Sequence, residues 1–247
     1  MSRPLVILGT GGSAYDVLDV IEAINIEAIN AAAPTWDVAG FLDDARPPGT
    51  RHLGLEVLGP LREAARFRDH AFVNAIGSDK SFRRLPAILA STGLAADRFA
   101  TLVHPAASVS GRARVGRGVT VNYGVSVGGG ARIGDNVTLC PGCIVGHDTT
   151  IEDYSVVAPG AVISGFVHVR RSCYIGTRAA IRQHLRIGEG SLIGMGAVVV
   201  REVAAGAVVA GNPARPLGTP PLTRLPIEVG PAGAPTLTSD PTPEGTP

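Results

Sequence analysis

The chain has 247 residues, of which 45% are hydrophobic and 17% charged, and its formal net charge is +1. That apolar share supports a sizeable core and excludes a wholly disordered chain, and the length fits one or two domains of roughly 100–150 residues. The balanced charge and the 4% aromatic content provide neither the basic surface nor the stacking platform that a nucleic-acid partner requires.

The sequence contains no segment that reads as a leader or a membrane anchor. The apolar run Leu5–Leu8 is shorter than the roughly 7–15 residues of a signal-peptide core, and no run reaches the ~20 apolar residues of a membrane span. Three cysteines are too few for a disulfide framework and indicate a reducing compartment. We therefore expect a cytoplasmic protein without a membrane partner.

Residues 1–100 alternate strand-like and helical segments. Apolar runs at 5–8, 38–42 and 71–76 predict buried strands, and the spacing of apolar residues after the first run predicts a helix. Further helical segments are expected near 60–68 and 82–91. Alternation of this kind favours a parallel sheet covered by helices, so the sequence predicts an α/β, Rossmann-like domain over residues 1–100.

Glycines and acidic residues follow the strands of this domain. Gly9, Gly11 and Ala14 fit the form GxGxx(G/A), in which a helix N-terminus presents free N–H groups to a phosphate. Asp43 and Asp44 end the next predicted strand, where a carboxylate can reach a ribose hydroxyl. These segments share the carboxyl edge of the sheet, where open α/β folds bind ligands. The pattern favours a nucleotide-type ligand; the alternative is a glycine turn beside solvated acids.

The centre of the chain is an internal repeat with a period of six. An aliphatic residue stands at every sixth position from Val103 to Val199, usually followed four places later by a small or β-branched residue. We interpret each hexapeptide as one short strand and a corner, and three of them as one coil of about 18 residues. The aliphatic side chains would then fill a triangular prism whose coils stack at roughly 4.8 Å. A helix is excluded because its period is 3.6 and because glycine and β-branched residues are too frequent here.

Cys140 and Cys143 have the spacing of a redox or zinc CxxC pair. The repeat, however, places Cys143 and Cys173 at the small inward position, where a free cysteine packs as a compact hydrophobe. The chain has no second CxxC to complete a zinc site. Core packing is therefore the favoured interpretation, and we expect no metal.

His147 and Asp148 are the residues of the repeat best suited to chemistry. His147 lies two positions after an inward aliphatic residue and should therefore point outward. An imidazole can accept a proton at cellular pH, and an adjacent carboxylate favours the protonated ring. The alternative is an ordinary surface histidine beside an ordinary surface aspartate.

These features together resemble a known family. The sequence is similar to the sugar acetyltransferases that join a small nucleotide-binding domain to a left-handed β-helix, the sialic acid O-acetyltransferase and UDP-4-amino-sugar N-acetyltransferase family. The likeness runs from Leu5 to about Leu217 and rests on the segments 9–13, 41–44, 75–79, 103–105, 146–148, 158–161 and 211–215. It implies an all-β, left-handed parallel β-helix over residues 101–217. The Pro- and Thr-rich residues 218–247 are expected to form a disordered tail.

The resemblance also implies an activity, the transfer of an acetyl group from acetyl-CoA to an amino group or hydroxyl of a nucleotide-activated sugar or a sialic acid. His147 would be the general base and Asp148 the residue that raises its basicity. A homotrimer is implied, with the pantetheine arm between neighbouring prisms. The acetyl-CoA positions of the family fall on Val156, Thr177 and Met195, and its acceptor-nucleotide positions on Gly11, Gly12, Ser13, Asp43 and Asp44. The family often has histidine where this chain has Ser13 and Val156, which leaves the identity of the acceptor open.

Three other functions remain open. An NAD(P)-dependent enzyme would use the GxGxxA loop, and a non-catalytic, sugar-nucleotide-binding trimeric scaffold would need no base. One class of carbonic anhydrase shares the β-helix and would need three histidines around one zinc ion. His147, His168 and His184 are not separated by whole coils, so this last function is disfavoured.

Overall fold

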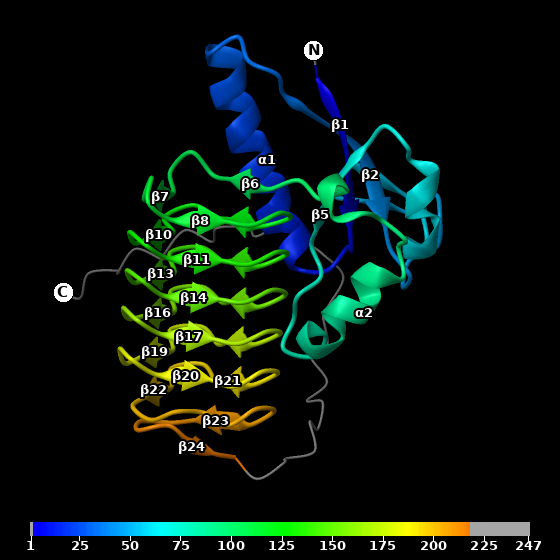
Figure 1. The fold of residues 1–247 in the computed structure, drawn as a ribbon. Coiled ribbons are helices and arrows are strands. Elements are labelled where there is room, and N and C mark those ends of the chain that lie inside the picture. Colours follow the sequence, from blue (N-terminus) through cyan, green and yellow to red (C-terminus); the bar gives the residue numbers. More distant parts are fainter. Residues whose placement is uncertain (1, 218–247) are drawn as a thin grey trace, which may run out of the picture.

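The computed structural model describes residues 2–217, and the predicted disordered tail at 218–247 lies outside this range. A small α/β unit stands against one side of a tall three-sided prism (Figure 1). Among the described residues, no helix has the length and apolar character needed to cross a membrane.

The N-terminal unit is built on a five-stranded sheet with the order β3-β4-β2-β1-β5. Its strands β1 (Arg3–Leu8), β2 (Trp36–Leu42), β4 (Leu55–Gly59) and β5 (Ala71–Asn74) run parallel. Strand β3 (Arg51–His52) pairs antiparallel with β4, a hairpin that the sequence analysis missed. The helical elements are α1 (Ser13–Asn30), η1 (Leu61–Arg66), η2 (Phe82–Arg84), α2 (Leu85–Ala90) and η3 (Ala96–Arg98).

Successive residues of β1 point to opposite faces of the sheet and build two cores. Leu5 and Ile7 pack with α1 on one face, and Val6 and Leu8 pack with η1 and α2 on the other. Both faces are thus covered, as a parallel sheet requires. The predicted Rossmann-like unit is confirmed, although the segment expected to be helical near 60–68 forms the 3₁₀-helix η1.

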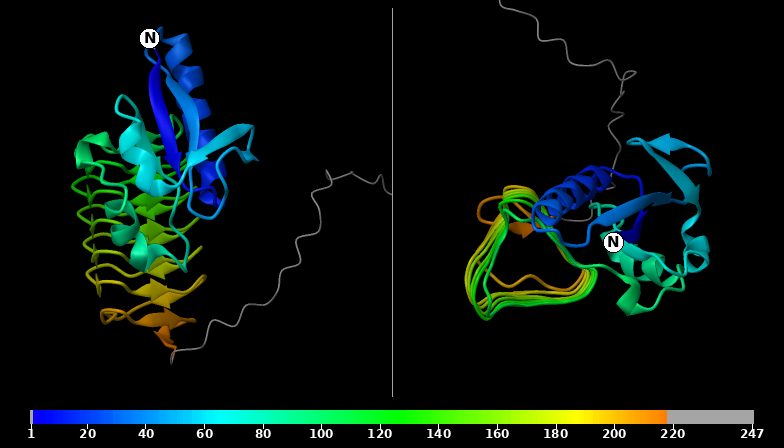
Figure 2. Two further views of the ribbon diagram at one scale, coloured as in Figure 1. Left: turned by 90° about the vertical axis from the view of Figure 1, so that its right-hand side faces the viewer. Right: turned by 90° about the horizontal axis from the view of Figure 1, so that it is seen from above.

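The prism is a left-handed parallel β-helix, as the resemblance implied. Seen from above, its coils superpose as a triangle with the α/β unit outside one side (Figure 2). We call its sides the docked face, the apolar face and the arginine face. The docked face consists of β6 (Leu102–Val103), β9 (Thr120–Val121), β12 (Thr138–Leu139), β15 (Val156–Val157), β18 (Tyr174–Ile175), β21 (Leu192–Ile193), β23 (Val208–Ala210) and β24 (Arg215–Pro216). The apolar face consists of β7 (Ser108–Val109), β10 (Ser126–Val127), β13 (Ile144–Val145), β16 (Val162–Ile163), β19 (Ala180–Ile181) and β22 (Val198–Val199). The arginine face consists of β8 (Arg114–Val115), β11 (Arg132–Ile133), β14 (Thr150–Ile151), β17 (His168–Val169) and β20 (Arg186–Ile187).

The register of the prism follows the repeat. Paired residues on neighbouring strands are 18 positions apart, as for Ile144 with Val162 and Thr150 with His168. The second residue of most strands is the repeat aliphatic, and these side chains form one buried core along the prism. The predicted inward direction of the aliphatic residues is therefore confirmed.

The last coil departs from this register. Leu192 pairs with Val208 and Ile187 with Val203, so this coil is two residues shorter than the others. Strand β24 then turns back and pairs antiparallel with β23.

The α/β unit rests on the docked face through the segment that follows β5. The rings of Phe82 and Tyr174 lie 5.7 Å apart, and Arg83 Nε donates to the Gly190 carbonyl at 2.8 Å. Strand β6 belongs to both units, because Leu102 packs in the core beneath α1 and also pairs with β9.

Candidate active site

A cavity of about 470 Å³ opens at the carboxyl edge of the sheet, at the N-terminus of α1. All five predicted nucleotide positions, Gly11, Gly12, Ser13, Asp43 and Asp44, line it. The Ala14 and Tyr15 N–H groups donate to the Gly11 and Gly12 carbonyls at 3.0 and 3.2 Å, so the amides available to a ligand in the cavity are those of the preceding residues of the loop. The structure thus brings together the segments that the sequence placed at this edge.

Gly9 shapes the loop that forms one wall of this cavity. Its φ of +98° is a conformation that side chains rarely adopt, and a Cβ atom here would lie 2.5 Å from Ile76 Cγ1. Glycine is therefore required where the loop leaves β1. Ser78, Ser81 and Arg84 also line the cavity. Of these, the sequence alone points only to Ser78, because the segment Gly77-Ser78-Asp79 follows the strand β5.

Asp43 uses both carboxylate oxygens inside the protein. Oδ2 accepts from the N–H and the hydroxyl of Thr10 at 2.8 and 2.9 Å, and Oδ1 accepts from the N–H of Ala45 at 2.7 Å. Burial by itself raises the pKa of Asp43, but these hydrogen bonds and one from the Arg46 N–H outweigh it and hold the pKa below its ordinary value. Asp43 therefore ties the glycine loop to the loop after β2.

Asp44 is exposed and has one oxygen engaged. Its Oδ1 accepts from the Leu61 N–H at 2.9 Å, at the start of η1. The sequence analysis assigned both Asp43 and Asp44 to a ribose hydroxyl. In the structure, the protein itself occupies both oxygens of Asp43, so Asp44 is the better acceptor for a ligand hydroxyl.

His147 and Asp148 lie in the turn from β13 to β14, on the edge between the apolar and arginine faces, which we call the His147 edge. His147 Nδ1 is 3.0 Å from Asp148 Oδ2, and the histidine side chain is 61% exposed. Because a carboxylate only accepts hydrogen bonds, this contact places the ring hydrogen on Nδ1 and leaves Nε2 as the acceptor. A Cβ atom on Gly130, in the preceding coil, would lie 2.4 Å from Asp148 Oδ1, so this glycine makes room for the carboxylate.

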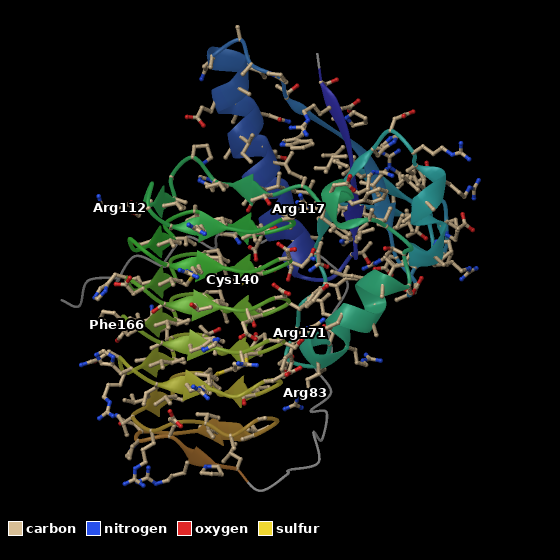
Figure 3. All side chains as sticks on the ribbon, in the orientation of Figure 1. Arg83, Arg112, Arg117, Cys140, Phe166 and Arg171 are labelled. Atoms are coloured by element: carbon tan, nitrogen blue, oxygen red, sulfur yellow. The ribbon has the colours of Figure 1, made fainter. Side chains whose placement is uncertain are left out.

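An aromatic column that the sequence analysis missed continues along this edge. The Phe166 ring meets the His147 ring edge-on with centroids 4.9 Å apart, and it stacks on His184 at 4.8 Å and 7°. Figure 3 shows Phe166 on the side of the prism away from the α/β unit. Phe166 occupies the position of Asp148 in the next coil, 18 residues later, so the repeat itself could have identified it as a neighbour of the His–Asp pair.

The three predicted acetyl-CoA positions separate into two groups. Thr177 and Met195 are neighbours in adjacent coils on the edge between the docked and apolar faces, where Gly196 N–H donates to the Thr177 carbonyl at 2.8 Å. We call this the Met195 edge; Met195 itself is 81% exposed. Val156 is only 2% exposed and packs against Gly77 beneath the α/β unit. The apolar face separates His147 from Thr177 and Met195, so one chain does not bring base and cofactor positions together.

The cysteines lie in the core. Cys143 and Cys173 are fully buried, and Cys140 is nearly so. Burial raises the pKa of Cys140 to about 12 and that of Cys173 to about 11, and it raises the pKa of Cys143 as well. These groups are therefore protonated thiols, and the CxxC spacing belongs to core packing.

The three histidines of the zinc alternative do not converge. His168 Nε2 contacts Glu152 Oε1 at 2.7 Å on the arginine face, whereas His184 stacks beneath Phe166. Within residues 2–217, no group of three or more His, Cys, Asp or Glu side chains is placed to hold a metal ion.

Known proteins resemble both parts of the chain. The family model of the PglD N-terminal domain matches residues 4–85, and that of the bacterial transferase hexapeptide (six repeats) matches residues 130–165. The acetyltransferase domain of PglB from Neisseria gonorrhoeae is 30% identical with a TM-score of 0.72, covering 87% of this chain and all of that one. PerB from Caulobacter crescentus, solved with CoA and GDP-perosamine, is 27% identical with a TM-score of 0.73 and coverage of 87% and 97%.

A shorter match was found to curated enzymes. It is 49% identical over 41 residues to the 2,3,4,5-tetrahydropyridine-2,6-dicarboxylate N-acetyltransferase of Staphylococcus aureus. The matched segment spans only 17% of the length of this relative.

The chain thus combines a parallel-sheet unit that carries a glycine-loop cavity with a hexapeptide-repeat β-helix that carries an exposed His–Asp pair. The PglB acetyltransferase domain is also known in complex with acetyl-CoA, at 30% identity and with all of that chain covered. The chain belongs to the family of sugar acetyltransferases with a left-handed β-helix.

Proposed function

We propose that this protein transfers an acetyl group from acetyl-CoA to an amino group of a nucleotide-activated sugar, with His147 as the general base. The exposed His147–Asp148 pair carries the proposal, because it presents a free Nε2 on an edge of the prism. The relatives support an amino acceptor, since PerB is solved with CoA and GDP-perosamine and related structures are described as perosamine N-acetyltransferase. Transfer to a hydroxyl or to a sialic acid is the competing outcome.

The proposed reaction requires one proton transfer at His147. Nε2 accepts the proton that the amine loses as its nitrogen attacks the thioester carbonyl. The new C–N bond forms, the C–S bond breaks, and the proton on Nε2 passes to the departing thiolate. Asp148, at Nδ1, stabilises the imidazolium present between these two transfers.

The cavity at the N-terminus of α1 would hold the nucleotide of the acceptor. Its phosphates would be bound by the amides at Gly11, Gly12 and Ser13, and Arg84 lines the same cavity. Asp44 offers an acceptor for a sugar hydroxyl. Asp43 contributes by holding the loop in place.

The pantetheine arm of acetyl-CoA would lie along the Met195 edge. Thr177 and Met195 are exposed there, next to each other in successive coils. A thioether side chain packs readily against a flexible apolar arm. Val156 would act from beneath, by supporting Gly77 at the rim of the nucleotide cavity.

The active unit would be a homotrimer. The outward residues of the apolar face include Ile144 and Val162, both exposed in a single chain, and an exposed apolar strip of this kind marks an interaction surface. Packing this face against another copy would bring the His147 edge of one copy toward the Met195 edge and the cavity of another. The cytoplasmic location stays a prediction that rests on three unpaired cysteines.

The test is an acetyl-transfer assay with purified protein. Acetyl-CoA is incubated with a panel of nucleotide-linked amino sugars, nucleotide sugars without an amine, and sialic acids, and free CoA thiol and product mass are measured. We expect transfer to an amino sugar, with turnover reduced about 10²-fold or more in His147→Ala and by a smaller factor in Asp148→Asn, which keeps the ring oriented.

Two results would contradict the proposal. Near-normal turnover in His147→Ala would show that His147 is not the general base. Protection of the fold from thermal unfolding by NAD(P) but not by CoA would instead favour the NAD(P)-dependent enzyme.

A further inference from the structure

His147 is held on its edge by contacts other than the one with Asp148. Gly165 lies one coil further along the prism, directly against the imidazole. A Cβ atom built on Gly165 would lie 2.7 Å from His147 Nε2 and 2.8 Å from Cε1. A side chain larger than that of glycine at position 165 would therefore clash with His147 Nε2, the nitrogen that would accept the proton.

Backbone conformation does not explain the glycine at 165. Its φ lies outside the left-handed region, whereas other glycines such as Gly160 and Gly190 have φ near +66°. Alanine is thus allowed by the backbone here, and the contact with the ring is what alanine would disturb.

Phe166 has the opposite character. It is a bulky residue with φ +58°, a conformation that such residues rarely adopt, and it is 49% exposed. The same left-handed conformation recurs at this position of the turn in other coils, as at Tyr154 and Arg178, so it belongs to the repeat. What distinguishes Phe166 is its ring, which meets His147 edge-on and is itself stacked on His184.

We infer that Gly165 and Phe166 are positioning residues for the general base. Gly165 leaves Nε2 unobstructed, Phe166 limits rotation of the imidazole, and His184 supports the Phe166 ring from the other side. This inference rests on the proposed function of His147 and adds the contacts that keep its ring in a reactive orientation.

The first test replaces Gly165 with alanine. The new Cβ would displace the ring, and a displacement of about 1 Å at a reacting group can cost on the order of 10²-fold in rate. We expect kcat to fall by about this factor while KM for acetyl-CoA and the unfolding temperature stay unchanged.

Gly129→Ala is the matched control for this variant. Gly129 holds the same place two coils before Gly165, on the other side of His147, and its Cβ would make ordinary contacts with Ser110 and Arg112, at 3.5 Å or more. We expect wild-type kcat. Equal losses in both alanine variants would mean that any change to this edge reduces turnover, and would overturn the role of Gly165.

The second test replaces Phe166 with glycine. Glycine suits φ +58°, so relief of the strained backbone should offset the lost ring contacts and keep the unfolding temperature near that of wild type. We expect kcat to fall about 10-fold or more at unchanged KM for acetyl-CoA. Phe166→Tyr should recover wild-type kcat, because it keeps the ring against His147.

Ala32→Gly is the control for strain relief alone. Ala32 also has φ in the left-handed region, at +52°, and lies after α1, far from His147 along the chain. It should leave kcat unchanged.

The outcomes separate this inference from the proposed function. Wild-type kcat in Phe166→Gly and Gly165→Ala, combined with loss of turnover in His147→Ala, would overturn the inference alone. A rise in KM without a change in kcat would make Phe166 a substrate contact and would also overturn it. Absence of acetyl transfer by the wild-type protein with every acceptor would overturn both.

Discussion

At the scale of single residues, Asp43 acts as a structural anion beside the cavity at the N-terminus of α1. Its carboxylate receives hydrogen bonds from Thr10, Ala45 and Arg46 and joins two loops, which Arg46 Nε also links by donating to Thr10 Oγ1 at 3.0 Å. The ionised form is the one that these donors stabilise, so the anchor is sensitive to acid.

We predict that Asp43→Asn lowers the stability of the protein in a pH-dependent manner. Because the folded pKa of Asp43 is lowered, its ionised form contributes stability that is fully present above the unfolded value of about 3.9 and is lost as pH falls through the lower folded value. The wild-type protein should therefore unfold at a higher temperature than the variant at pH 7, and the difference should shrink below about pH 4.

Thermal unfolding curves of the two proteins across this pH range measure the effect. Asp44→Asn is the matched control, because Asp44 makes a single such bond. A difference between wild type and Asp43→Asn that does not change with pH would show that ionisation of Asp43 plays no part.

At the scale of the repeat, residues 18 apart form columns with a shared chemistry. Cys143 stands in a column with Val125, Ala161, Ala179 and Ala197, which are buried and apolar. Cys173 stands instead between Ser155 and Ser191, whose hydroxyls donate to backbone carbonyls of the next coil. Its thiol makes the corresponding contact, to the Gly188 carbonyl at 3.1 Å.

Two serine substitutions at fully buried cysteines should therefore differ. Cys143→Ser would bury a hydroxyl in an apolar column and should cost about 1–3 kcal/mol in the free energy of unfolding. Cys173→Ser would keep the hydrogen bond to Gly188 and should cost less than about 1 kcal/mol.

Denaturant unfolding of both variants measures the two costs, and Cys143→Ala serves as the control that adds no polar group. Equal costs for both serine variants would show that the column environment does not decide the outcome.

The same columns explain how much of the molecule the sequence predicts. The period of six defines the prism, its inward aliphatic residues and the outward direction of His147, because each hexapeptide repeats one local conformation. Phe166 was missed because the contact that matters lies between coils, and a search for catalytic residue types passes over an aromatic side chain. The β3–β4 hairpin was missed because β3 has only two residues, too few to show a periodic pattern.

At the scale of the whole molecule, the parts of the proposed site lie on different edges of one chain. His147 lies at one end of the apolar face in cross-section and Met195 at the other, and the cavity belongs to the unit on the docked face. Closed symmetric assembly is the ordinary way in which such parts meet.

We predict that two inactive variants restore each other. His147→Ala lacks the base, and Gly12→Trp would fill the cavity, at a position with open space for a side chain. Chains co-refolded at equal amounts should recover roughly a quarter of wild-type turnover, because half of the bases and half of the cavities are intact and they pair at random. No recovery would place the whole site within one copy.

A matching variant tests the surface itself. Ile144→Arg would bring charge into the apolar face and should yield monomers in sedimentation analysis with little acetyl transfer. A monomeric variant that retained full turnover would separate assembly from activity.

The shortened last coil has a consequence for the behaviour of the protein at high concentration. A stack of parallel strands ends in unsatisfied backbone groups that invite another stack to continue it, and end-to-end growth of that kind produces fibres. Here the last coil is two residues shorter than the others, and β24 pairs antiparallel with β23. Strand β24 therefore becomes the edge strand of the docked face. This edge strand has only two residues, and Pro216 lacks an N–H donor, so it offers a poor template for end-to-end pairing of copies on this face.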